Sequence, residues 1–444
     1  MKSIRKIHII ALIGFTLLFM HALAQEDTNL IKERIENSSG TEKVDLLLEL
    51  SDAFKFNDWE KSLNAAQDAL FHANKINDTS RIAKACSKIG NIYYYTYKYE
   101  KASEFYHKSH EAYKSINDLR GNANLYHNIG MLHQAKNKYD SALIFYQKSL
   151  TIEEQLNNIE GAAESMSNIG SVYQLKGDYD SAILMHEKSL EKYKAVGNDQ
   201  KIILTYLYIS DLCMRNGYFE ESFKYLNQAL NLAEQNNDLS QKSTALNLMA
   251  QGHYEMQNFS FAEKLLNQSL LLRNKLGDKE GESILLNNLG WLSMEINNYE
   301  KADQYYRRAL EIQKVSDDKR VISNIYTNLG MNLLRQGKAK ESIAYFNTAI
   351  DIAKKIKVKP ETRRAYEQLI IAYAQLQEYE KSKKYMEAYS AIDDSARLKN
   401  IEEELESLLQ EDDEPVDFGY SYYLLAGMLF ILVIIIMIIV SRKR

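Results

Sequence analysis

Proline, cysteine and glycine are scarce in this chain. Its 444 residues include two prolines, two cysteines and eighteen glycines, so long helices meet few residues that would break them. Cys86 and Cys213 lie about three repeat lengths apart in the pattern described below, too far for a disulfide. We expect both to be small core residues. The composition predicts an almost wholly helical, all-α chain.

An excess of basic residues is also lacking. The formal net charge is -5, so the chain has little with which to neutralise phosphates, and we expect no nucleic-acid partner. Glycine-rich phosphate loops, nucleophile elbows and HExxH strings are absent from the sequence. His107 and His110 have helical i, i+3 spacing but no third metal ligand, while His133 and His253 occupy a register where other repeats carry tyrosine. We therefore predict no catalytic residues, no metal and no cofactor, and so no enzyme.

Strongly apolar runs occur near the two ends of the chain. At the N-terminus, basic residues precede the apolar run 7–20, and Ala22-Leu23-Ala24 follows. This order predicts a signal peptide over 1–24, cleaved before Gln25, and a lead-in over 25–40. The alternative is an uncleaved anchor, although the run is shorter than the ~20 residues needed to cross a bilayer.

At the C-terminus, residues 420–440 contain no charged side chain, which predicts a transmembrane helix over 419–440. Three tyrosines at one end suit a membrane interface, and the basic segment 441–444 predicts a cytoplasmic tail. The acidic segment 397–418 predicts a short helix and a solvated spacer beside the membrane. The region before it would then lie outside the membrane.

A 40-residue period runs through that region. Small residues recur every 40 positions, which we call the grid positions. A second small residue follows each of them twelve positions later, as Ala142 follows Gly130. An aromatic residue stands nine positions after most grid points, with Ala339 as the exception. The grid residues are Gly90, Gly130, Gly170, Ser210, Ala250, Gly290 and Gly330.

Each period has the pattern of a helix hairpin. Apolar residues recur at three- and four-residue spacing over 121–136 and over 139–156, with a break at Asn137-Lys138. Pairs such as Asn117-Asp118 and Gly277-Asp278 separate one hairpin from the next. Asn and Gly tolerate the left-handed conformation that ends a helix, and Asp caps the next helix. Small grid residues let helices approach closely, so neighbouring hairpins are expected to stack.

These features resemble the tetratricopeptide repeat family. The strings NIGMLHQAKNKYDSALIFYQKSL and NLGWLSMEINNYEKADQYYRRAL carry the resemblance, which covers 41–396 as about nine units. It implies a right-handed superhelical solenoid of helix hairpins, followed here by the C-terminal transmembrane helix. The period exceeds the family's usual 34 residues, which suggests a longer second helix. The first unit, with Leu50-Ser51 and an apparent one-residue slip, and the last, with Leu369-Ile370, are interpreted as caps.

The resemblance also implies a binding surface. In this family the first helix of each hairpin lines a concave groove, and the residue two before the grid position points into it. A ladder of asparagines there could bond an extended peptide backbone. The open alternative is that these asparagines are surface or helix-packing residues, because Lys88, Tyr208 and Leu248 interrupt the ladder. The ladder residues are Asn128, Asn168, Asn288 and Asn328, and Asn91, Asn124, Asn287 and Asn324 would widen the groove.

The sequence thus predicts a membrane-anchored, extracytoplasmic scaffold that binds a protein or peptide. Free C-termini are not expected ligands, because the Lys and Arg set of a carboxylate clamp is missing. The alternative function is a ligand-sensing component of a transmembrane signalling system whose effector is a separate chain, since the arrangement resembles the sensor halves of bacterial repeat-containing signalling proteins. The abundance of Lys, Asn, Ile and Tyr resembles Gram-negative proteins, which would place the repeats in the periplasm.

Overall fold

The computed structural model describes residues 28–55, 58–316, 318–356 and 358–390. The predicted signal peptide (1–24), acidic spacer (397–418), transmembrane helix (419–440) and tail (441–444) all lie outside these residues. Of the helices within the described ranges, none is long and apolar enough to cross a membrane.

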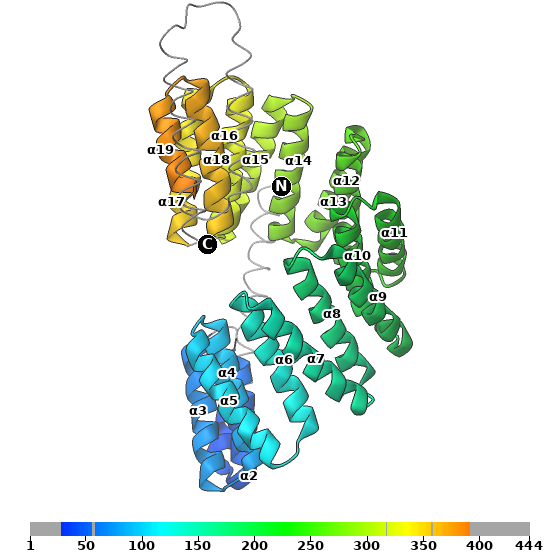
Figure 1. The fold of residues 1–444 in the computed structure, drawn as a ribbon, viewed down its shortest axis with the longest axis vertical. Coiled ribbons are helices and arrows are strands. Elements are labelled where there is room, and N and C mark those ends of the chain that lie inside the picture. Colours follow the sequence, from blue (N-terminus) through cyan, green and yellow to red (C-terminus); the bar gives the residue numbers. More distant parts are fainter. Residues whose placement is uncertain (1–27, 56–57, 317, 357, 391–444) are drawn as a thin grey trace, which may run out of the picture. The chain divides into compact units, whose positions relative to one another are not determined.

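The described part of the chain is all α, as predicted. A helix over 28–37 precedes a regular succession of helical hairpins (Figure 1). The remaining helices are α2 (Gly40–Phe54), α3 (Trp59–Lys75), α4 (Thr79–Tyr95), α5 (Tyr99–Ser115), α6 (Leu119–Ala135), α7 (Tyr139–Gln155), α8 (Ile159–Leu175), α9 (Tyr179–Val196), α10 (Asp199–Arg215), α11 (Phe219–Gln235), α12 (Leu239–Glu255), α13 (Phe259–Leu276), α14 (Lys279–Glu295), α15 (Tyr299–Ser316), α16 (Lys319–Arg335), α17 (Ala339–Lys355), α18 (Lys359–Gln375) and α19 (Tyr379–Ser390).

The two helices of a hairpin are nearly equal in length. The first helices α4, α6, α8 and α10 each have 17 residues. The second helices α5, α7 and α11 also have 17 residues, and α9 has 18. The long period is therefore shared by both helices and is not carried by the second helix alone.

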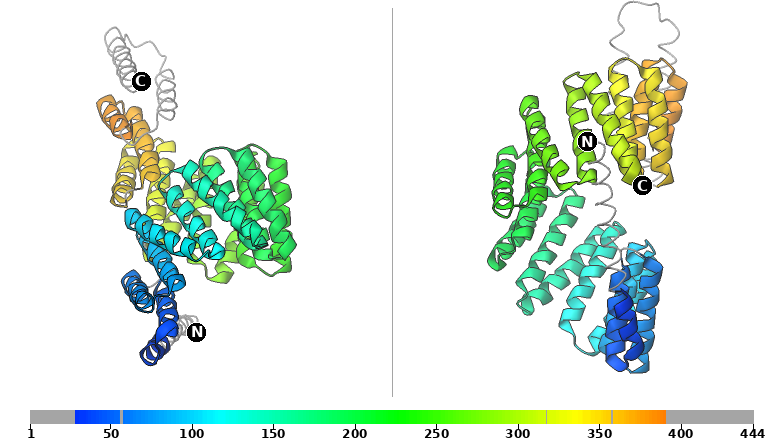
Figure 2. Two further views of the ribbon diagram at one scale, coloured as in Figure 1. Left: turned by 60° about the horizontal axis from the view of Figure 1, so that its bottom comes forward. Right: turned by 180° about the vertical axis from the view of Figure 1, so that it is seen from behind.

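The chain divides into two compact units, Met1–Leu272 and Arg273–Arg444, with the boundary in the last turn of α13. We call them the N-terminal unit and the C-terminal unit. Consecutive helices pack on one another from α2 to α12 and from α14 to α19, and several first helices of successive hairpins also touch, as α4 touches α6 and α16 touches α18. Figure 2 shows this stacking within each unit from two further sides.

The turns between hairpins use the predicted chemistry. Asn117 has a φ of 53° and Gly277 a φ of +67°, both left-handed. The following aspartates cap the next helix: Asp118 accepts from the backbone N–H of Gly121 at 2.8 Å, and Asp278 accepts from that of Gly281 at 2.9 Å. The prediction that these pairs end one helix and start another is confirmed.

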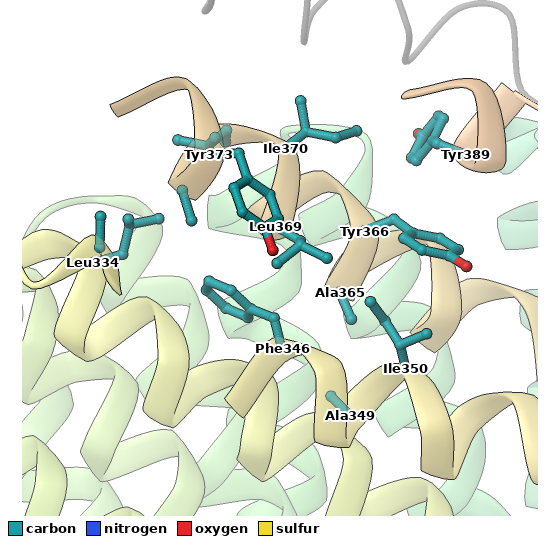
Figure 3. Close-up of a cluster of buried hydrophobic side chains, with 13 residues drawn as sticks. Leu334, Phe346, Ala349, Ile350, Ala365, Tyr366, Leu369, Ile370, Tyr373 and Tyr389 are labelled. Atoms are coloured by element: carbon teal, nitrogen blue, oxygen red, sulfur yellow. The ribbon is translucent and has the colours of Figure 1, made fainter. Parts of the chain in front are cut away.

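The grid glycines make room for a large ring sixteen residues later. A Cβ on Gly130 would stand 2.6 Å from the Tyr146 ring, and one on Gly330 would stand 2.5 Å from the Phe346 ring. Figure 3 shows Phe346 between Leu334 and Leu369 in the core of the C-terminal unit. Where the grid residue is Ser210 or Ala250, the residue sixteen positions later is the smaller Leu226 or Leu266. Grid residue and ring are thus matched in volume.

The slip in the first repeat is also visible. The Ser222 hydroxyl donates to the Ser210 carbonyl at 2.9 Å across a spacing of twelve residues. In the first hairpin, the Ser62 hydroxyl donates to the Ser51 carbonyl at 2.7 Å across eleven. The same contact is therefore made with one residue fewer, and α2 is correspondingly short, with 15 residues.

The cysteines and two of the histidines lie where predicted. Cys86 and Cys213 are buried free thiols, and burial raises the pKa of each to about 11. His133 stacks on Phe145 with ring centroids 5.2 Å apart, and His253 contacts two phenylalanine rings. Both histidines are half-buried among aromatic rings, and desolvation lowers the pKa of each.

Candidate functional site

A hollow of the N-terminal unit lies along its first helices. It has a volume of about 620 Å³ and is bordered by side chains of α4, α6, α8 and α10. We call it the central groove. Its lining combines aromatic, polar and charged residues, including Tyr94, His127, Asn168, Lys201, Thr205 and Tyr208.

A second hollow adjoins the central groove. It has a volume of about 480 Å³, lies among α6, α7 and α8, and shares His127 and Glu164 with the groove. We call it the acidic pocket, because its lining contains carboxylates but neither Lys nor Arg. Its polar residues include Asn124, Asn128, Glu153, Glu160 and Glu164.

One ion pair stands at the border of the two hollows. Lys201 Nζ on α10 lies 2.9 Å from Glu164 Oε1 on α8. This hydrogen bond raises the lysine pKa above its ordinary value. Both side chains remain partly exposed, so the pair contributes little to stability but places one charge of each sign at the groove.

One histidine lines the central groove, and a second lies buried behind the lining residues Ser167 and Tyr208. His127 is half-buried, and desolvation lowers its pKa. His186 is 1% exposed and stacks against Tyr208 with ring centroids 5.7 Å apart. Burial lowers the His186 pKa to about 4, so this ring is neutral at pH 7. Its Nδ1 lies 3.2 Å from the hydroxyl of Ser167, a residue that lines the groove.

The structure brings three of the predicted asparagines to these hollows. Asn168 lines the central groove, and its Nδ2 lies 3.3 Å from Nδ1 of His127. Asn124 and Asn128 line the acidic pocket. Asn91 lies elsewhere: its Oδ1 accepts from the Tyr106 hydroxyl at 2.8 Å beside a small separate cavity.

The predicted asparagines of the C-terminal unit are arranged differently. Asn328 is 2% exposed, donates to Asn287 Oδ1 at 2.8 Å and accepts from the Arg364 guanidinium at 2.7 Å. Asn288 and Asn324 are half-buried. Asn328 therefore packs helix against helix and does not present its amide to an open groove.

Sequence reasoning did not select several groove residues. Tyr208 occupies the ladder register, but it was interpreted only as an interruption. Glu164 and Lys201 pair across neighbouring hairpins, at a spacing close to the 36 residues that separate Lys136 from its partner Glu100 and Lys176 from Asp140. A search for opposite charges nearly one period apart would have found them.

The fold and groove define a helical-repeat scaffold of the kind that binds other proteins. Family models described as tetratricopeptide repeat match residues 81–155, 241–314 and 321–395, and further ones match 162–196 and 205–236. The chain belongs to the tetratricopeptide repeat family. This fold is typical of non-enzymatic interaction scaffolds.

Solved structures share the fold at low sequence identity. Aspartyl phosphate phosphatase F from Bacillus subtilis has a TM-score of 0.55 at 12% identity, covering 76% of this chain and 92% of that one. The apo quorum sensor NprR from B. thuringiensis has a TM-score of 0.52 at 16% identity, covering 76% and 97%. A Rap protein complexed with Competence and Sporulation Factor has a TM-score of 0.51 at 13% identity, covering 82% and 99%. No curated protein matches the sequence.

Proposed function

We propose that this protein is a scaffold that binds a protein or peptide partner in the central groove. The observation that carries the proposal is a pair of asparagines one repeat apart with unused hydrogen-bonding capacity: Asn168 lines the central groove, and Asn128 lines the adjoining acidic pocket. Neither the Asn128 amide nor the Asn168 Oδ1 has a hydrogen bond to any described residue. An extended peptide backbone supplies N–H and C=O groups at regular intervals, which suit such a pair.

The rest of the groove suits the same kind of ligand. Tyr94 and Tyr208 offer aromatic surface with hydroxyl tips, which bind well at low entropic cost. Two proteins of this fold support the proposal by their descriptions, one being a quorum sensor and the other a complex with Competence and Sporulation Factor.

The proposal includes a location. The apolar segments 7–20 and 420–440 support an exported protein held by one membrane helix, with the repeats on the extracytoplasmic, periplasmic side and the C-terminus inside. Protease added to spheroplasts should digest the repeats and spare the last residues. Repeats that resist protease until the membrane is broken would contradict this location.

Site-specific photo-crosslinking in intact cells tests the groove. A photoreactive residue at Tyr208, which is 52% exposed in the central groove, should capture a discrete partner. Ile144 on α7 is similarly exposed, at 56%, but lines neither hollow, and provides the control. Capture at Tyr208 should disappear when Asn128 and Asn168 are both changed to Ala. Equal capture at both positions, insensitive to the asparagines, would exclude the groove.

A second function is a sensor that passes its bound state to a separate effector chain. The fold shared with the quorum sensor NprR favours it. The crosslinking experiment separates the two functions: a scaffold captures its partner constantly, whereas a sensor captures an effector only when ligand occupies the groove.

A further inference from the structure

We propose that the acidic pocket is a subsite for an organic cation, the side chain of a Lys or Arg in the peptide that the central groove holds. This inference rests on the proposed function and names one chemical feature of the partner. The central observation is the Glu153 carboxylate on α7, which is 4% exposed and lines the pocket.

Glu153 is buried without a cationic partner among the residues described. Its Oε2 accepts one hydrogen bond, from Asn158 Nδ2 at 2.7 Å. A buried carboxylate is costly unless a positive charge or several donors compensate it. One amide hydrogen bond leaves most of this requirement unmet, so the pocket favours a ligand that brings positive charge.

Glu282 in the C-terminal unit provides the contrast. It is the other buried glutamate of the described chain, at 3% exposure. Lys279 Nζ lies 2.7 Å from one of its oxygens and Arg308 lies 2.6 Å from the other. Glu282 is thus neutralised from within the protein, whereas the matching charge for Glu153 is missing from the described residues.

The surroundings of Glu153 reinforce the charge. Glu160 and Glu164 line the same pocket, and the lysine at its border, Lys201, is already paired with Glu164. Asn128 adds an amide oxygen that can accept from an ammonium or guanidinium group. Because the pocket shares His127 and Glu164 with the central groove, a peptide lying in the groove could direct one basic side chain into it.

The test uses the full chain, purified in a mild detergent, and a bead-displayed library of random decapeptides. Glu153→Gln keeps the size of the side chain and its acceptor for Asn158 while removing the charge. Glu154→Gln, the exposed neighbour on the same helix, is the matched control. An enriched peptide is then resynthesised with its basic residue changed to Gln, and affinities are measured by fluorescence anisotropy. Spermidine, titrated by calorimetry, tests for a free amine as the source of the cation.

Enriched peptides sharing one Lys or Arg would support the inference. Their affinity should fall about 30-fold in Glu153→Gln and stay unchanged in Glu154→Gln. Glu160→Gln, which changes an exposed side chain, should weaken binding about threefold. The Gln-substituted peptide should bind the native protein and Glu153→Gln equally.

Other outcomes separate this inference from the proposed function. Peptides enriched without a basic residue, or bound equally by Glu153→Gln, would contradict the cation subsite but would still support peptide binding in the central groove. Spermidine binding that needs Glu153, with no peptide enriched, would support the cation subsite and count against peptide binding. If neither probe binds, both proposals fall.

Discussion

Asn168 in the N-terminal unit and Asn328 in the C-terminal unit occupy the same register of their repeats but have different surroundings. Each Nδ2 approaches a residue 41 positions earlier, His127 in one case and Asn287 in the other. The difference lies 36 positions later, where the N-terminal unit has Leu204 and the C-terminal unit has Arg364. Arg364 donates to Asn328 and lies over a Trp291 ring, whereas Leu204 leaves the Asn168 oxygen open to the groove.

One residue of the following repeat therefore distinguishes an asparagine oxygen that is open to a hollow from one that is held by a neighbouring side chain. Each repeat places the asparagine at the same backbone position, and a residue of the next repeat determines how exposed the asparagine side chain is. This comparison can be tested in both units, beginning with the largest expected effect.

His186 should make the N-terminal unit sensitive to acid in a way that the C-terminal unit is not. Its folded pKa is about 4 and its ordinary value is 6.5, so the unfolded chain takes up a proton first as pH falls. Stability is fully present above pH 6.5 and declines by about 3 kcal/mol as pH falls toward 4. Tyr306 and Phe346 occupy this register in the C-terminal unit. His186→Tyr should abolish the decline, measured by hydrogen exchange in α8 and α9; an unchanged decline would contradict this assignment.

Removing the Arg364 guanidinium should destabilise the C-terminal unit. Arg364→Met leaves the buried Asn328 oxygen without its donor, which should cost about 2 kcal/mol. Faster hydrogen exchange in α16 and α18 would report this loss. Arg320→Met, on an exposed side chain of α16, is the control. Equal effects of both substitutions would show that Arg364 does not hold Asn328 in place.

The grid glycines should be equally intolerant of added volume in both units. Gly330→Ala places a Cβ against the Phe346 ring, and such overpacking lowers the free energy of unfolding by about 1–3 kcal/mol. The higher helix propensity of alanine restores up to about 1 kcal/mol. We therefore expect a net loss of about 1.5 kcal/mol. Adding Phe346→Leu should restore most of that stability, since Ala250 already pairs with Leu266. Urea unfolding of the four chains of this double-mutant cycle gives the coupling energy, and strictly additive losses would refute the size matching.

Leu204→Arg should give the central groove the closed arrangement of the C-terminal unit. The new guanidinium would reach the Asn168 oxygen as Arg364 reaches Asn328, and crosslinking at Tyr208 should fall about tenfold, equivalent to about 1.4 kcal/mol. Leu204→Gln introduces a shorter, uncharged side chain and should reduce crosslinking at Tyr208 less than Leu204→Arg does. Full capture by the arginine variant would mean that Asn168 takes no part in binding.

The sequence was sufficient to predict the helical-repeat fold of the described residues, because each repeat carries the same pattern of residues. The glycine at position 130 and the Asn117-Asp118 turn recur with the period, so local chemistry and long-range stacking agree. The one-residue slip of the first repeat was predicted from its sequence, and the hydrogen bonds between Ser51 and Ser62, eleven residues apart, confirm it.

The site could be predicted only in part, because exposure depends on residues of adjacent repeats. The asparagine register includes Asn128 and Asn168, which line hollows, but the same register holds a buried amide at Asn328. The sequence of one repeat does not predict that Arg364, two helices later, donates to Asn328. Glu153 was overlooked for a similar reason, since its burial follows from Gly161 on the next helix, which leaves space for its carboxylate.

The smallest expected effect concerns Tyr97, which sits at the turn inside a hairpin of the N-terminal unit with a φ of 59°. Asn297 occupies the same register in the C-terminal unit at the same φ. Asparagine tolerates the left-handed region better than an aromatic residue, and the Tyr97 ring is 80% exposed, so little packing is lost on replacing it.

Tyr97→Asn should stabilise the N-terminal unit by about 0.5–1 kcal/mol, seen as a higher urea midpoint with an unchanged slope. The reverse change, Asn297→Tyr, should lower the midpoint of the C-terminal unit by a similar amount. If Tyr97→Asn destabilises instead, the edge contact between the Tyr97 and Tyr99 rings outweighs the backbone strain at this turn.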